Sequence, residues 1–176
     1  MKSPKVIARL VEAAVSAQKH AYCPYSRFAV GASVLTESGR IFAGCNVENA
    51  SYGLTICAER AAIFNAISRN QRGMKAICIA GRSPKPCGAC RQVMFEFSTK
   101  ETALYLVDLN SNPRRQTVKR TSVHAMLPSA FDPLASGLLA ANPQNLLRNR
   151  AGAAAKRRRR RPSPSKKSKR ARGRRK

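Results

Sequence analysis

The apolar residues of this chain alternate between helical and strand periodicity, and this alternation restricts the fold more than any other feature. Over residues 5–20 they recur on one helical face, which predicts an amphipathic helix. Residues 28–35 and 40–47 are rich in β-favouring residues and flank a polar turn that contains Gly39, which predicts a hairpin. Strands that alternate with helices predict an α/β domain with a mixed sheet, in which parallel strands follow the hairpin.

Helices and strands continue to alternate after the hairpin. The further elements expected, in chain order, are a helix with Thr55 as N-cap and Gly73 as its stop, a strand over 76–80, a helix over 88–97, a strand over 102–108 and a weaker strand over 116–123. Two strand-to-helix junctions in this order bring Cys57 and the pair Cys87 and Cys90 to one place.

The C-terminal 26 residues differ from the rest of the chain in charge. Residues 151–176 hold 14 of the 34 Lys and Arg residues and no acidic residue. The first 150 residues hold all eight acidic residues and the other 20 basic ones, which leaves a net charge of +12. The basic segment has almost nothing to bury, so we expect it to be disordered and drawn to polyanions. A solubilising extension and a localisation signal remain alternatives for this tail.

No apolar run approaches the roughly 20 residues that a membrane-spanning helix needs, and the first residues lack a signal-peptide core. Neither export nor membrane insertion is indicated, and the cytoplasm is the expected compartment. In a chain without an export signal, six cysteines are more typical of thiols or metal ligands than of disulfides.

Three cysteines and one glutamate carry the chemical signature, as C-A-E at 57–59 and P-C-G-A-C at 86–90. Thiolates, two of them in a C-x-x-C, suit zinc, and three protein ligands leave the fourth tetrahedral position open to water. A glutamate two residues after the first ligand can stand beside that water and carry its proton. The expected Zn²⁺ ligands are Cys57, Cys87 and Cys90, and the expected catalytic residue is Glu59.

A closed structural site with Cys45 or Cys78 as fourth ligand is the alternative, although both cysteines lie in apolar, strand-like runs where cysteine is usually a small buried hydrophobe. Three thiolates and one Zn²⁺ sum to a charge of −1, so positive charge is needed nearby. Arg60, three residues after Cys57, is well spaced to donate to the ligand sulfurs, and helix N-termini would add partial positive charge. Arg91 is interpreted as an ordinary surface arginine.

The order C-A-E, then P-C-x-x-C, is the zinc deaminase signature, with Cys57 in place of the histidine of its other form. Together with the surrounding sequence it resembles the small homotetrameric cytidine deaminases over roughly residues 5–135. The segments that carry the resemblance are Tyr25-Ser-Arg-Phe-Ala-Val-Gly-Ala32, Gly44-Cys-Asn-Val-Glu-Asn-Ala-Ser-Tyr52, Cys57-Ala-Glu-Arg60 and Met126-Leu-Pro-Ser-Ala-Phe131.

The resemblance implies a three-layer cytidine-deaminase-like fold, with a mixed central sheet between helices. It divides the chain into a deaminase domain over 1–135, a linker over 136–155 and a disordered Lys/Arg-rich tail over 156–176.

The resemblance also implies the substrate contacts. Asn46 and Glu48 correspond to the residues that bind the ribose hydroxyls, and Phe28 to the aromatic residue that packs on the pyrimidine. Phe131 corresponds to an aromatic residue that reaches a neighbouring subunit's site, although from the residues alone Phe28 and Phe131 are more typical of a core. The expected substrate contacts are Phe28, Asn46, Glu48, Ala58 and Phe131.

The implied reaction is hydrolytic deamination of cytidine, and of deoxycytidine, to the uridine nucleoside and ammonia, with Glu59 passing protons to N3 and the departing amine. Three alternatives stay open: deamination of another aminopyrimidine such as blasticidin S, deamination of a polynucleotide, and nucleic-acid binding by an inactive deaminase scaffold with its basic tail. Two departures from the family pattern, at Cys23 and at His124-Ala125, spare the metal residues.

Overall fold

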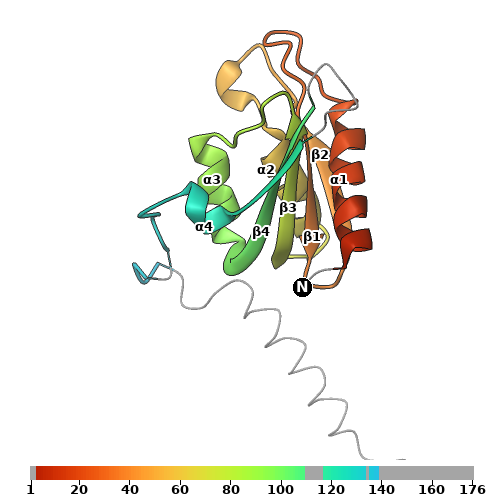
Figure 1. Cartoon of the computed structure of the whole chain (residues 1–176). Helices are drawn as coiled ribbons and strands as arrows, with labels where there is room; N and C mark the ends of the chain where they lie inside the picture. Colours follow the sequence, from red (N-terminus) through yellow and green to blue (C-terminus); the bar gives the residue numbers. More distant parts are fainter. Residues whose placement is uncertain (1–2, 110–116, 134, 139–176) are drawn as a thin grey trace, which may run out of the picture.

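The computed structural model describes residues 3–109, 117–133 and 135–138, which form a sheet between layers of helices (Figure 1). Most of the expected linker and the whole of the expected tail lie outside the described residues. In chain order the elements are α1 (Pro4–Gln18), β1 (Gly31–Thr36), β2 (Ile41–Cys45), the 3-10 helix η1 (Tyr52–Leu54), α2 (Ala58–Ile67), β3 (Met74–Gly81), α3 (Gly88–Glu96), β4 (Ser98–Asp108), β5 (Thr117–Ser122) and α4 (Val123–Met126).

The strands of the described sheet are ordered β2-β1-β3-β4-β5. β1 is antiparallel to β2 and to β3, β3 and β4 are parallel, and β5 is antiparallel to β4. The turn between β1 and β2 has Gly39 at φ +84°, the left-handed region that glycine enters without steric cost. The predicted hairpin and the predicted three-layer α/β fold with a mixed sheet are therefore confirmed.

The two faces of the sheet bury different kinds of side chain. Along β3, Ala76, Cys78 and Ala80 lie in the core cluster beneath α1, whereas Ile77 and Ile79 lie in the cluster covered by α2 and α3. Successive residues of a strand point to opposite faces, so one strand supplies both cores. Small side chains on the first face let α1 lie close to the sheet.

Two glycines permit this close packing of helices on the sheet. A Cβ atom at Gly31 would lie 2.1 Å from the Ala14 carbonyl oxygen of α1, and one at Gly44 would lie 2.5 Å from the Ala62 nitrogen of α2. Both neighbours are backbone atoms, which cannot move aside as a side chain can. The edge hairpin is thus held between α1 and α2.

Two predicted boundaries of α2 are wrong. Thr55 is not its N-cap, because Ile56 pairs with Val47 through two backbone hydrogen bonds and keeps this segment extended up to Cys57, which is the N-cap. Gly73 is not its stop, because the chain already leaves the helix at Ser68 and Asn70 adopts φ +59°. A left-handed residue after a helix is commonly glycine, and asparagine is the usual substitute.

Candidate metal centre and substrate site

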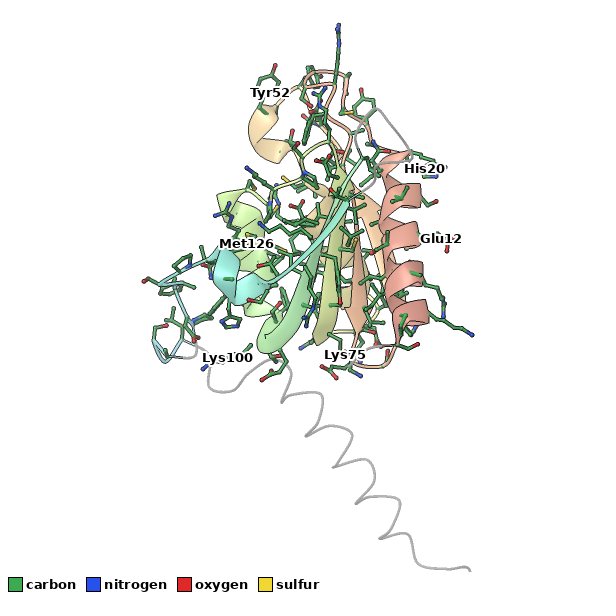
Figure 2. The ribbon with its side chains drawn as sticks, in the orientation of Figure 1. Glu12, His20, Tyr52, Lys75, Lys100 and Met126 are labelled. Atoms are coloured by element: carbon green, nitrogen blue, oxygen red, sulfur yellow. The ribbon has the colours of Figure 1, made fainter. Side chains whose placement is uncertain are left out.

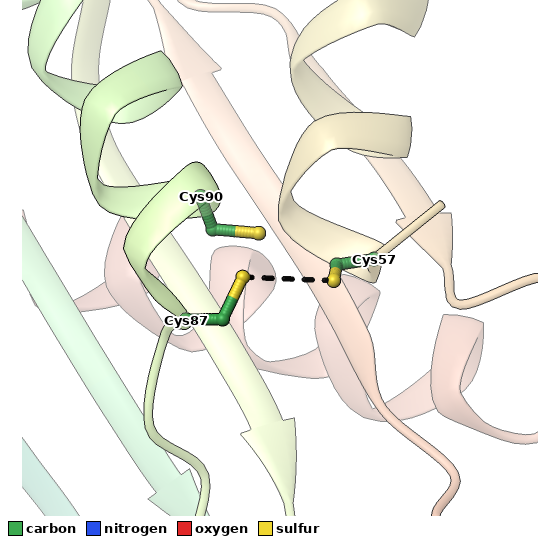
Figure 3. Close-up of side chains that lie close together, drawn as sticks. All are labelled: Cys57, Cys87 and Cys90. Atoms are coloured by element: carbon green, nitrogen blue, oxygen red, sulfur yellow. Dashed lines mark hydrogen bonds between the residues drawn. The ribbon is translucent and has the colours of Figure 1, made fainter. Parts of the chain in front are cut away.

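Three cysteines meet where α2 and α3 begin (Figure 3). Cys57 is the N-cap of α2, Cys87 is the N-cap of α3, and Cys90 lies in the first turn of α3. Their Sγ atoms all lie within 4.8 Å of one another, and those of Cys57 and Cys87 are 3.9 Å apart. Both helix N-termini therefore direct partial positive charge to one group of thiols.

The donor set fits zinc. Tetrahedral zinc with Zn–S bonds of about 2.3 Å holds its sulfur ligands about 3.8 Å apart, close to the spacing found here. Among the described residues, neither alternative fourth ligand joins this group. Cys78 is buried beneath α1 on the other face of the sheet, and the Cys45 thiol donates to the His20 carbonyl oxygen. The group is thus an open three-thiol site.

Arg60 contributes positive charge beside the thiols. Its Nη2 atom donates to the Thr55 carbonyl oxygen at 2.9 Å and contacts the Cys57 sulfur at 3.8 Å. Hydrogen bonds from Cys90 and from Arg60 lower the pKa of Cys57 to about 5, although partial burial opposes the shift. The hydrogen bond to the Cys57 thiolate raises the pKa of Cys90. Cys57 is thus prepared to act as a thiolate ligand.

Glu59 is the buried acid of the site. It occupies the second position of α2 and is only 4% exposed, while the preceding Ala58 is fully buried. Burial raises the pKa of Glu59, and the negative charge of Cys57 adds to this shift. A raised pKa makes the carboxylate a better proton acceptor than an exposed one, as a proton carrier requires.

Asn46 and Glu48 hold the segment that carries Phe28. The Asn46 carboxamide accepts from the Val30 N–H and donates to the Phe28 carbonyl oxygen, both at 2.9 Å. The Asn46 side chain thus bonds the backbone of residues 28 and 30 in place of a neighbouring strand. This explains why β1 begins at Gly31 and not at residue 28, as the sequence predicted. Asn46 is 8% exposed, and Phe28 is half-buried.

Glu48 fixes the same segment from its other end. Its Oε2 atom accepts from the backbone N–H groups of Tyr25 at 2.9 Å and Ser26 at 3.2 Å, which leaves acceptor capacity on Oε1. The resemblance named Asn46 and Glu48 only as ribose contacts, and their structural bonds to this loop were missed. No pattern in the sequence predicts such hydrogen bonds between a side chain and a distant backbone group.

Phe131, the last of the expected substrate contacts, is 59% exposed. Its carbonyl oxygen accepts from Gln92 Nε2 of α3 at 3.0 Å. Arg91, expected on the surface, is half-buried and donates to two carbonyl oxygens, those of Pro86 and Met126. These two contacts could not be predicted from the sequence, because both acceptors are backbone atoms.

Comparison with known proteins agrees with this geometry. Residues 4–106 match the model of the cytidine and deoxycytidylate deaminase zinc-binding region. The chain belongs to this family. A cytidine deaminase of Halalkalibacterium halodurans is 45% identical over 125 residues, which cover 69% of this chain and 91% of the relative. A probable cytidine deaminase of Dictyostelium discoideum is 44% identical over 129 residues, covering 71% of this chain and 83% of the relative.

Solved structures of the family share the fold. A crystal structure of cytidine deaminase from Burkholderia pseudomallei superposes with a TM-score of 0.64 at 44% identity, covering 70% of this chain and 98% of that chain. One from Mycobacterium tuberculosis gives 0.60 at 38% identity, covering 72% and 97%. Family membership and the three-thiol group together identify zinc as the cofactor. The helices of the described residues include none with the length and apolar character that a membrane span requires.

Proposed function

We propose that this chain catalyses the hydrolytic deamination of cytidine and deoxycytidine to uridine and deoxyuridine, with release of ammonia. The observation that carries this proposal is the open group of three thiols beside the buried carboxyl of Glu59. Cytidine deaminases at 41–45% identity over about 70% of the chain favour a cytidine-type nucleoside over the other aminopyrimidines and over a polynucleotide.

Cys57, Cys87 and Cys90 are the proposed zinc ligands. Zinc bound there would act as a Lewis acid and make a water molecule reactive near neutral pH. Arg60 balances part of the thiolate charge, as its contact with the Cys57 sulfur supports. The two helix N-termini act in the same direction.

Glu59 is the proposed proton carrier. Its carboxylate accepts one proton from the attacking water and delivers it to N3 of the cytosine ring. It then accepts the second proton of that water and passes it to the 4-amino group, which leaves as ammonia. The raised pKa of Glu59 supports this role, because the group must hold a proton between the two transfers. Its burial also keeps bulk water from competing for that proton.

The proposed nucleoside contacts are made by the loop before β1 and by the residues that hold it. Asn46 and Glu48 are proposed to bind the ribose hydroxyls with the donor and acceptor capacity left over from their backbone bonds. Phe28, whose backbone Asn46 holds, is proposed to pack on the pyrimidine. Ala58 lies at the start of α2, between the ligand Cys57 and Glu59, and is proposed to face the base.

A homotetramer is the proposed assembly, with Phe131 reaching the site of a neighbouring subunit. The 59% exposure of Phe131 supports a contact outside its own chain. The reaction would serve pyrimidine salvage in the cytoplasm. The basic segment 151–176, which has no acidic residue, is proposed to bind nucleic acid without sequence preference. Such binding would associate the enzyme with the nucleoid or chromatin.

The test is the loss of cytidine absorbance catalysed by purified, zinc-loaded protein, compared with cytosine, blasticidin S and single-stranded DNA as substrates. We expect turnover of cytidine and deoxycytidine and little of the other three. Turnover of blasticidin S or of DNA in preference to cytidine would overturn the proposal.

A further inference from the structure

Two consecutive residues of α3 hold the segment that follows α4. Arg91 donates from Nε to the Pro86 carbonyl oxygen at 2.9 Å and from Nη1 to the Met126 carbonyl oxygen at 3.1 Å. Gln92 donates from Nε2 to the Phe131 carbonyl oxygen at 3.0 Å. Figure 1 shows α4 beside α3, and Figure 2 labels Met126 at the end of α4.

Arg91 links two segments that are 40 residues apart in the chain. Pro86 directly precedes the proposed ligand Cys87, and Met126 is the last residue of α4, where a helix leaves carbonyl oxygens without helical partners. A guanidinium group is planar and presents its donors in a fixed fork, so two bonds from it fix the relative position of their acceptors. Lysine has a single nitrogen and cannot reproduce this fork.

Phe131 depends on such anchors because its own burial does little to position it. Its side chain is 59% exposed, and the preceding segment turns sharply at Ser129, whose φ is +51°. The Gln92 bond reaches Phe131 itself, whereas the Arg91 bond fixes the start of the same segment. Both anchors come from α3, the helix whose N-cap is Cys87.

We infer that Arg91 and Gln92 are positioning residues, which fix Phe131 against α3 of its own chain and so set how it reaches the neighbouring subunit's site. This inference rests on the proposed role of Phe131 in nucleoside binding. Without either anchor Phe131 samples more positions, so substrate binding weakens while the proton transfers of Glu59 proceed nearly unchanged. The expected signature is a raised KM with little change in kcat.

The first test is a double-mutant cycle with Gln92→Met and Phe131→Ala, measured with cytidine. Gln92→Met keeps the side-chain length but removes the donor, and we expect it to raise KM about two- to tenfold, the range for one hydrogen bond. If Gln92 acts through Phe131, it has little further effect once Phe131→Ala is present. Additive effects on KM, or an equal loss in kcat, would overturn the inference.

Arg91→Lys and Arg91→Met extend the cycle, and Arg69→Met is the matched control. Arg69 is an exposed arginine after α2 whose guanidinium contacts Asn65 and Phe42 rather than the site. We expect KM to rise in the order wild type, Arg91→Lys, Arg91→Met, with zinc content unchanged in Arg91→Lys. A KM for Arg91→Lys equal to that of the control would count against the inference for Arg91.

The second test does not need enzyme activity. The chain contains four tyrosines but no tryptophan, so Phe131→Trp introduces a single fluorophore that can be excited selectively, at the position in question. Adding Gln92→Met, or Arg91→Lys, should lower the fluorescence anisotropy of that fluorophore, while the thermal unfolding midpoint stays near that of the parent. Unchanged anisotropy would overturn the inference, whereas absence of cytidine turnover in the wild type would overturn only the proposed function.

Discussion

Cysteine occurs on both faces of the sheet, and the two environments give it opposite chemistry. On the α2–α3 face, neighbouring hydrogen-bond donors lower the pKa of Cys57 to about 5. On the α1 face, burial among apolar side chains raises the pKa of Cys78 to about 12. Cys57 caps a helix beside Arg60, and Cys78 lies in the middle of β3.

The face of the sheet covered by α2 and α3 therefore holds the reactive residues, whereas the face covered by α1 is a packed core. The thiols and the buried carboxyl gather where two helices begin, because helix N-termini offer positive charge and unpaired N–H groups. Beneath α1, small residues and Gly31 let the helix lie against the strands. Substitutions of the same residue type on the two faces should therefore have different consequences.

The largest contrast is expected between Cys87→Ser and Cys78→Ala. Serine is a poor zinc ligand, so Cys87→Ser should lose most of its zinc and all measurable deamination. Cys78→Ala should retain both and lose only about 1 kcal/mol of stability, the scale of one buried methylene. Zinc content by atomic absorption, with cytidine turnover on the same samples, measures the contrast. Loss of zinc from Cys78→Ala would abolish the distinction between the faces.

A pair of glutamates gives the next largest contrast. Glu59→Gln keeps the shape of the side chain but removes its proton affinity, so kcat should fall by a factor on the order of 10² to 10⁴ with zinc retained. Glu12→Gln, on the exposed surface of α1, is the matched control and should leave kcat unchanged. A Glu59→Gln enzyme with more than about a tenth of wild-type kcat would remove Glu59 from the role of proton carrier.

The packing face has its own sensitive position at Gly31. Alanine there would place Cβ 2.1 Å from the Ala14 carbonyl oxygen, so α1 must shift. We expect a loss of about 1–3 kcal/mol in the free energy of unfolding, typical of overpacking. Gly53→Ala is the control, because a Cβ at Gly53 meets no atom within 4 Å. Chemical denaturation of both variants checks this, and equal stability would show that α1 is not held closely.

Much of this division was predictable from the sequence. Apolar periodicity predicted the order of helices and strands, and the spacing of Cys57, Cys87 and Cys90 predicted a metal site at two helix starts, because these patterns act over a few neighbouring residues. The start and stop of α2 were predicted wrongly, since the bridge between Val47 and Ile56 keeps the chain extended before Cys57. The bonds of Asn46, Glu48 and Arg91 join distant backbone atoms and leave no local pattern.

The smallest expected effect is the pH dependence that Glu48 gives to stability. Hydrogen bonds from Ser26 and from the Tyr25 backbone lower the pKa of Glu48 below its ordinary value of 4.5, although slight desolvation opposes them. A group whose pKa is lower in the folded state stabilises the fold above the unfolded pKa, and this contribution is lost as pH falls through the folded pKa. Glu48→Gln should therefore unfold at a slightly lower temperature than wild type at pH 7, and the two midpoints should converge below about pH 4.5. Thermal unfolding between pH 3 and 7 measures this. Glu12→Gln, which also removes one negative charge but lies on the exposed surface of α1, is the control. If the difference between the unfolding midpoints of wild type and Glu48→Gln stayed the same from pH 3 to 7, the bonds to residues 25 and 26 would not hold the loop in solution. The loop that carries Phe28 would then owe its position to its other hydrogen bonds, chiefly the two from the Asn46 side chain.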